Sequence, residues 1–438
     1  MPSLELSKPA LVAGLFLMAP VLRIEASPPF NPAPGLTRAE PDHPEAEAVL
    51  AGVATWGDVP GACAELGALD RAPVAYLFDQ LNKGIDRSTP AGATVQLTLQ
   101  RVSTAALTDY LSAQLESGIS EPRVQAALMV LGDRSEPGEL QWLIRLADEP
   151  LAPENRPIRA RVVEEALARR LRAHESDFGL LPERLQGTSE KLAGPAVRAL
   201  ASLASPASGQ ALSDLLGTWP AADAFVLHAL EQVVNSAGRL DSLSLADVRE
   251  YLDSGQPEQV GLACRVLATC RDEDSLDDWV RLLTNPSPSV REEAHRALRS
   301  IAGLPLGIRP SAWNTWLDEE QTWWRTQSAA TRHSLEHGNA TEAVAAVREI
   351  CLKRTRSEEL CDLLGLALDR PEVGIAQLAA RGLAAQSSLR AEDWLVQALE
   401  RPRSEVRSVA LESLRRRTGL ELGPEPTQWR RALFSLER

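Results

Sequence analysis

The most restrictive feature of this sequence is a long internal repeat. Residues 286–313 align with residues 402–429 at a constant separation of 116 and without a gap, and 12 of the 28 positions are identical. The identical positions of the first copy are Pro286, Val290, Arg291, Ala294, Leu298, Arg299, Gly303, Leu304, Leu306, Gly307, Pro310 and Trp313. One residue of slippage upstream also pairs Asp278-Trp279 with Asp393-Trp394. Self-similarity of this kind indicates a chain built from repeated structural units.

Within the repeat, the spacing of apolar residues predicts a pair of helices. Val290, Ala294 and Leu298 recur at intervals of four and therefore share one face of a helix. Ser289 is the expected N-cap of that helix, with Glu292 completing a capping box. Gly303 suits the left-handed position that follows a helix end. A two-helix unit cannot bury its own apolar face, so it is stable only when neighbours stack on it.

The same periodicity extends over most of the chain. From about Glu45 onward, apolar residues recur at spacings of three and four in segments of about 10 to 15 residues, which is typical of amphipathic helices. Only 94–102 alternates like a strand; Val95, Leu99 and Val102 also fit a helix, which we predict there. A parallel sheet would need several such runs. The expected fold is therefore all-α.

At these positions the sequence resembles the HEAT-repeat family, especially short bacterial HEAT-like repeats. The matching core is Pro286-x-x-x-Val290-Arg291-x-x-Ala294-x-x-x-Leu298, with its copy at 402–414 and a partial version at Pro195-x-Val197-Arg198. The resemblance implies an α-solenoid of about eight stacked antiparallel helix pairs, an armadillo-type superhelix that acts as a scaffold. It assigns 257–438 to HEAT-like repeats and 45–256 to irregular helical repeats. HEAT-like repeats also resemble those of phycobilin lyases, which leaves an enzymatic alternative open.

The amino terminus carries a short apolar run followed by a proline-rich segment. Residues 11–22 are uncharged and mostly apolar, but a bilayer span needs about 20 such residues. Residues 1–26 fit either a secretory signal peptide cleaved after Ala26 or a first helix docked on the body. The prolines of 27–44 indicate an extended linker. Export to the periplasm and a cytoplasmic location both remain open.

The charge balance bears on the class of partner. The chain has 60 acidic against 46 basic residues, a net charge of −14, whereas nucleic-acid binding needs a positive surface. No nucleic-acid partner is therefore expected, and the HEAT-repeat resemblance implies protein partners, which it does not identify. No cofactor is expected.

Four tryptophans lie on one predicted helix, at Trp313, Trp316, Trp323 and Trp324. Tryptophan is enriched at binding hot spots, so these residues are candidates for contact with a partner. The alternative is packing between repeats, where each indole buries a large area.

Arginines gather in the last repeat, most densely at Arg415, Arg416 and Arg417. This local positive edge in an acidic protein is a second candidate surface, for an acidic partner or for the acidic face of a second copy. The alternative is a solvated helix surface whose cations suit the helix ends.

One short motif raises the possibility of catalysis. His333, Glu336 and His337 match H-x-x-E-H, in which two histidines bind Zn²⁺ and the glutamate activates water. If the motif binds zinc, the alternative function is that of a metal-dependent hydrolase. If it does not, the motif is only a pair of exposed histidines at a helix end. No nucleophile elbow, phosphate-binding loop or dinucleotide fingerprint occurs in the sequence. Paired carboxylates such as Glu319-Glu320 are expected to form a solvated face.

The cysteines give no metal signature. The number of cysteines is odd, and no two of them form a C-x-x-C pair; they are Cys63, Cys264, Cys270, Cys351 and Cys361. We expect them to be buried apolar thiols, with a Cys351–Cys361 disulfide as the alternative in an oxidising compartment.

Overall fold

The computed structural model describes residues 43–69, 73–86, 88–117, 120–134, 138–149, 156–237, 242–386 and 388–436. These ranges are helical with short connections and contain no strand. The expected signal peptide and nearly all of the proline-rich linker lie outside them.

The described residues form 24 α-helices, more than the sixteen that eight hairpins would supply. The first twelve are α1 (Pro44–Ala51), α2 (Val59–Ala68), α3 (Val74–Asn82), α4 (Pro90–Arg101), α5 (Thr104–Ser117), α6 (Glu121–Gly132), α7 (Glu139–Asp148), α8 (Arg156–Ala173), α9 (Asp177–Leu185), α10 (Ala193–Leu203), α11 (Pro206–Asp214) and α12 (Asp223–Ala237). The remainder are α13 (Ser242–Glu250), α14 (Pro257–Thr269), α15 (Leu276–Leu282), α16 (Pro288–Ala302), α17 (Pro310–Thr326), α18 (Ser328–His337), α19 (Ala340–Ile350), α20 (Ser357–Leu368), α21 (Val373–Ala385), α22 (Arg390–Ala398), α23 (Ser404–Thr418) and α24 (Pro426–Leu436).

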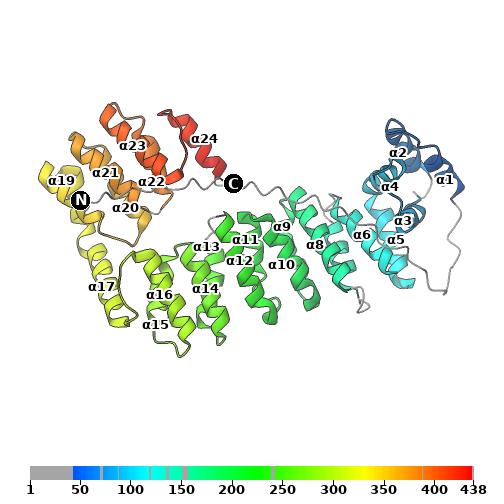
Figure 1. Ribbon diagram of the computed structural model, residues 1–438, viewed down its shortest axis with the longest axis horizontal. Coiled ribbons are helices and arrows are strands. Elements are labelled where there is room, and N and C mark those ends of the chain that lie inside the picture. The colour runs from blue at the N-terminus through cyan, green and yellow to red at the C-terminus, as the bar shows by residue number, and fades with distance from the viewer. Residues whose placement is uncertain are drawn as a thin grey trace, which may run out of the picture. The chain divides into compact units, whose positions relative to one another are not determined.

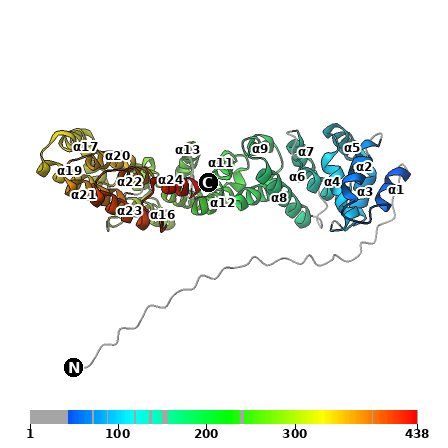
Figure 2. The same ribbon diagram turned by 90° about the horizontal axis from the view of Figure 1, so that it is seen from above.

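Helices pack against their neighbours in chain order. Helix α6 contacts α7 and α8, α14 contacts α12, α13 and α16, and α21 contacts α19, α20, α22 and α23. The views in Figure 1 and Figure 2 show consecutive helices side by side along the described chain. The prediction of an all-α fold is confirmed, and contact between neighbouring helix pairs is its main packing mode.

Helix α16 shows how the sequence sets its own boundaries. Val290, Ala294 and Leu298 are fully buried, as their spacing predicts. Gly303 follows the helix with φ +65°, a conformation that glycine adopts without the steric cost of a Cβ. The predicted cap at Ser289 is wrong. Ser287 is the N-cap residue, without a capping hydrogen bond from its side chain, because Pro288 occupies the first helical position.

The ambiguous segment 94–102 falls mainly within α4, which confirms the prediction of a helix. Thr89 caps α4 by accepting a hydrogen bond from the backbone N–H of Gly92 at 3.1 Å. Val95 and Leu99 are fully buried. The apparent alternation therefore arises from one apolar helix face.

The larger hydrophobic clusters divide within α17. One cluster extends from Ala46 to Leu317, and the next extends from Trp323 to Trp429. Residue 257, the expected start of the HEAT-like repeats, begins α14, whose buried residues from Val260 onward belong to the first of these clusters. Helix α17 therefore contributes side chains to two cores. No helix in the described ranges is long and apolar enough to span a membrane.

Candidate functional site

The four tryptophans share α17, as predicted, and most of their surface is buried. Trp313, Trp316 and Trp323 are 0%, 8% and 2% exposed, and Trp324 is partly buried. Trp313 and Trp316 form an edge-to-face pair with centroids 5.8 Å apart, and Trp323 and Trp324 form another at 4.9 Å. The first pair packs into the cluster that ends at Leu317, and the second packs into the cluster that follows. These positions favour the packing role for the indoles.

Trp313 also marks the internal repeat in three dimensions. Its indole N–H donates to the carbonyl oxygen of Gly307 at 2.8 Å, and Trp429 donates to Gly423 at the same distance. Arg291 donates to the carbonyls of the turn before α16, at Asn285 and Pro286. Its counterpart Arg407 donates to the carbonyls of Arg401 and Pro402. Two of the identical pairs, Trp313 with Trp429 and Arg291 with Arg407, therefore make the same contacts in both copies.

Two further indole N–H groups of α17 donate hydrogen bonds inside the chain. Trp323 donates to the Glu349 carboxylate at 2.7 Å, and Trp324 donates to the Thr355 hydroxyl at 3.2 Å. The guanidinium of Arg356 lies 5.1 Å from the Trp324 ring centroid, within the range of a cation–π interaction. Only the partly buried Trp324 leaves an appreciable part of its ring for a ligand.

The three candidate arginines of α23 have different environments. Arg417 is nearly buried; it donates to the carbonyl oxygens of Gln386 and Ser388 and pairs with Glu392 at 3.2 Å. Arg415 donates to the carbonyl oxygen of Leu422 at 2.8 Å. Arg416 has a side chain that is 69% exposed and pairs with Glu412 across one helical turn. Of the three, Arg416 is the most exposed, Arg415 is partly exposed, and Arg417 is the least exposed.

The H-x-x-E-H motif occupies the end of α18. His333 and His337 have ring centroids 5.0 Å apart, and both rings and Glu336 are exposed. His337 Nε2 lies 3.7 Å from a Glu336 carboxylate oxygen. In the part of the chain that the structure describes, no group of three or more His, Cys, Asp or Glu side chains is arranged to hold a metal ion.

All five cysteines are free thiols. Four are buried, as expected, and Cys351 is half-buried. Burial raises the pKa of Cys264 and of Cys361 to about 12. These thiols are held protonated, and the alternative disulfide between Cys351 and Cys361 is not formed in the structure.

The most concentrated polar contacts around α17 are not predicted by any pattern in the sequence. Glu320 was expected on a solvated face, but it is 4% exposed. One of its carboxylate oxygens accepts hydrogen bonds from the backbone N–H groups of Arg354 and Thr355, at 3.1 and 3.2 Å, and from the Thr355 hydroxyl at 2.9 Å. The solvated-face interpretation is wrong at this position because the loop after α19 folds onto α17.

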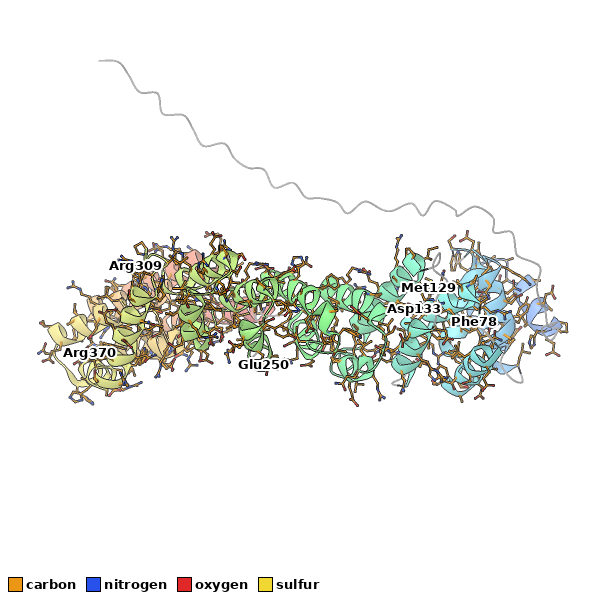
Figure 3. The ribbon with its side chains drawn as sticks, turned by 90° about the horizontal axis from the view of Figure 1, so that it is seen from below. Phe78, Met129, Asp133, Glu250, Arg309 and Arg370 are labelled. Atoms are coloured by element: carbon orange, nitrogen blue, oxygen red, sulfur yellow. The ribbon has the colours of Figure 1, made fainter. Side chains whose placement is uncertain are left out.

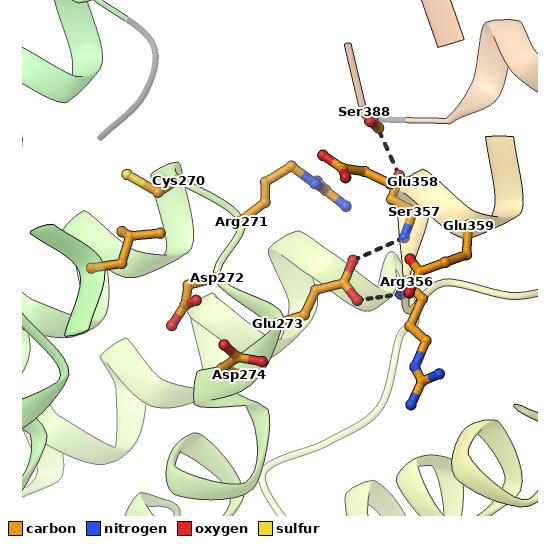
Figure 4. Close-up of a pocket in the computed structure, with 11 residues that line it drawn as sticks. Cys270, Arg271, Asp272, Glu273, Asp274, Arg356, Ser357, Glu358, Glu359 and Ser388 are labelled. Atoms are coloured by element: carbon orange, nitrogen blue, oxygen red, sulfur yellow. Dashed lines mark hydrogen bonds between the residues drawn. The ribbon is translucent and has the colours of Figure 1, made fainter. Parts of the chain in front are cut away.

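A second glutamate continues this arrangement. The Glu273 carboxylate accepts hydrogen bonds from the backbone N–H of Arg356 and, at 3.3 Å, from that of Ser357, which begins α20 (Figure 4). Four consecutive amides, from Arg354 to Ser357, thus donate to two carboxylates. A negative charge at the start of a helix is favourable because the first N–H groups lack partners within the helix. Burial nevertheless raises the pKa of Glu273.

Two cavities adjoin this contact. One of about 700 Å³ is lined from the η5 turn (Glu273–Ser275) and from the start of α20 (Figure 4). The other, about 410 Å³, reaches Trp324 and Leu317 on α17. Glu273, Asp274 and Arg356 line both cavities. The Glu273–Arg356 contact therefore lies where the linings of the two cavities meet.

A buried ionic network lies in the amino-terminal half. Arg170 is fully buried and donates to Asp177 at 2.6 Å, and Arg134, 4% exposed, donates to Glu139 at 2.5 Å. Arg170 also donates to the carbonyl oxygen of Arg134 at 3.1 Å. The periodicity of the sequence gives no sign of these charges, which the helices α6 to α9 enclose together.

Comparison with known proteins identifies no relative. No family model matches the chain, and no curated protein matches it. Among solved structures, an engineered protein from the Northeast Structural Genomics Consortium is similar at 18% identity, over 84% of this chain and 92% of its own. Its TM-score of 0.28 carries no argument about fold or function.

Proposed function

We propose that this chain is a non-enzymatic α-solenoid scaffold of HEAT-like repeats that binds protein partners. The supporting observation is the packing order, in which helices contact the next helix and the next but one. In such an array each unit buries its apolar face only against its neighbours, and the exposed faces of successive helices form an extended surface for partners.

The polar contacts between helices support the same proposal. Arg169 pairs with Asp133, Arg198 with Glu164, and Arg265 with Glu231, at sequence separations of 36, 34 and 34 residues. Asp133, which makes one of these contacts, and Arg370, which makes a similar one, are labelled in Figure 3. Arg403 donates to the carbonyl oxygen of Arg370, 33 residues earlier. A recurring separation of this size is expected when each two-helix unit contacts the unit before it.

The exposed cations of the last two helices are the proposed partner surface. Arg416 and Arg430 are 69% and 52% exposed, and Arg431 is also exposed. Each of the first two pairs with one surface glutamate, and such pairs are worth only about 0–1 kcal/mol, so an acidic partner can replace the glutamate at little cost. The protein as a whole has a net charge of −14, which makes this basic surface selective for a partner with a local acidic patch.

The test uses quantitative affinity capture from the native cell with the full chain. Arg416→Glu and Arg431→Glu reverse charges of the proposed surface. Arg172→Glu reverses an exposed charge on α8 and is the matched control. We expect both surface variants to lose a partner that the wild type and the control retain. Equal recovery of every partner by all four proteins would contradict the assignment of this surface.

A further inference from the structure

The described helices fall into two groups that α17 joins. We define the N-terminal group as α1 to α16 with the first part of α17, up to Leu317, and the C-terminal group as the end of α17, from Trp323, with α18 to α24. The hydrophobic clusters divide between Leu317 and Trp323, so each group has its own core. Helix α17 enters both cores and is therefore the apolar link between the two groups.

Polar contacts also join the two groups. Side-chain contacts between elements commonly join residues about 30 to 40 positions apart, as the Arg169–Asp133 pair does. The hydrogen bonds from Arg356 and Ser357 to Glu273 join residues 83 and 84 positions apart. Together with the bonds to Glu320, they place the loop before α20 against both η5 and α17. We call Glu273, Glu320 and the four amides of 354–357 the clasp.

The clasp has the properties of a contact that can open. Cavities of about 700 and 410 Å³ both adjoin Glu273 and Arg356, so the packing around this part of the clasp is less dense than in either core. Arg356 has φ +55°, a left-handed conformation that is unfavourable for a residue with a side chain. Backbone conformations of this kind persist where the surrounding contacts enforce them, and they cluster in switch regions. Release of the carboxylates would let Arg356 relax.

We propose that the clasp is a hinge latch. When the two glutamates release the amides of 354–357, the C-terminal group turns relative to the N-terminal group about α17, the helix in which the two cores divide. Because the basic partner surface of α23 and α24 belongs to the C-terminal group, opening changes its position relative to any contact made by the N-terminal group. The latch thus adjusts the spacing of surfaces on one scaffold. This last consequence rests on the proposed function, whereas the motion itself does not.

The experiment measures local opening and global shape in the same full-length variants. Amide hydrogen exchange reports directly on the N–H groups of 354–357, and small-angle X-ray scattering reports on the distance distribution of the whole chain. The variants are Glu273→Gln, Glu320→Gln and the double replacement. Glu412→Gln, which neutralises a 68% exposed carboxylate that pairs with Arg416, is the control.

We expect Glu273→Gln to accelerate exchange at Arg356 and Ser357 by roughly tenfold or more, because the side-chain NH2 of glutamine puts a donor in place of one of the two acceptor oxygens. The double replacement is expected to extend this acceleration to all four amides and to broaden the scattering distance distribution, while the control matches the wild type. Faster exchange with unchanged scattering from the double variant would reduce the clasp to a local helix cap and overturn the hinge. Unchanged exchange in every variant would also overturn it.

A variant that loses its helical circular dichroism is replaced by a milder one. Glu273→Asp keeps the charge but shortens the side chain, so it weakens the clasp without leaving a neutral group among these amides. It is expected to accelerate exchange at Arg356 and Ser357 while residues buried in each core, such as Val290 and Leu364, keep wild-type protection. Equal acceleration in both cores would show global destabilisation and contradict the proposal.

Discussion

The indole ring of Trp394 lies directly against the backbone of Gly365. A Cβ atom added to Gly365 would overlap with the ring carbons, so α20 and α22 approach as closely as they do because this residue is glycine. The ring is also fixed in place, since its Nε1–H donates to Asp362 at 2.9 Å and the Arg390 guanidinium lies 6.0 Å from its centroid.

Replacement of this glycine should destabilise the protein although alanine favours helices. Gly365→Ala gains about 1 kcal/mol of helix propensity but must displace a held indole, and overpacking costs typically about 1–3 kcal/mol. We expect a net loss of stability, measured as a lower urea midpoint. Gly61→Ala in α2 is the control, because a Cβ there meets nothing within 4 Å. A stabilised Gly365→Ala would contradict the close approach.

The buried ionic network predicts that replacing Arg170 destabilises the protein far more than replacing its neighbour Arg169. Arg170→Met leaves Asp177 buried without its 2.6 Å partner, and removal of one member of a buried pair costs about 3–5 kcal/mol. Arg169→Met removes a 35% exposed side chain and should cost about 0–1 kcal/mol. Urea unfolding of both variants checks the difference. If the costs are equal, the network is not a major source of stability.

The sequence predicted helix faces well and contacts between distant helices poorly. The spacing of Val290, Ala294 and Leu298 is a local property, and so is the turn at Gly303; both follow from the geometry of a single helix. Glu273 and Ser357 are 84 residues apart, and their contact depends on the path of every helix between them. The spacing of apolar residues along the sequence does not determine that path. For the same reason Glu320, assigned to solvent on composition, is enclosed by a loop from the next group of helices.

Glu273 makes the stability of the closed clasp depend on pH, and the direction of the change follows from the pKa of its carboxyl group. Burial raises this pKa above the ordinary 4.5, so the closed clasp binds a proton more tightly than the open one does. Closure is therefore most favourable at pH values below 4.5 and loses this contribution as pH rises through the raised pKa. The charged groups lining the adjoining cavities are Arg271, Asp272, Asp274, Asp277, Glu320, Arg325, Arg356, Glu358 and Glu359.

Amide exchange at Ser357, corrected for the intrinsic chemical rate at each pH, measures this effect. We expect the wild type to show greater protection near pH 5 than near pH 7.5. Glu273→Gln should abolish the part of the change that comes from this carboxyl group, while the titration of its neighbours remains. Identical pH profiles for the two proteins would show that Glu273 does not titrate between the open and closed states.

The thiols should differ in reactivity by their burial. Cys264 and Cys361 are fully buried with a pKa of about 12, so almost none of either is the reactive thiolate at neutral pH. Cys351 is half-buried and lies beside Gly382. We expect a thiol reagent to modify Cys351 first in the native protein, located by peptide mass spectrometry, and all five only after unfolding. Early modification of Cys361 would contradict its burial.

Metal analysis separates the scaffold proposal from the hydrolase alternative. A stable zinc site uses three or four protein ligands, and the exposed pair His333 and His337 offers only two, with Glu336 beside them. We therefore expect the purified protein to contain well under one zinc ion per chain after dialysis, by plasma mass spectrometry, and His337→Ala to leave that content unchanged. Stoichiometric zinc that disappears in His337→Ala would mean that a further ligand joins the motif. The two histidines at the end of α18 would then be zinc ligands, and the metal-dependent hydrolase would replace the scaffold as the proposed function.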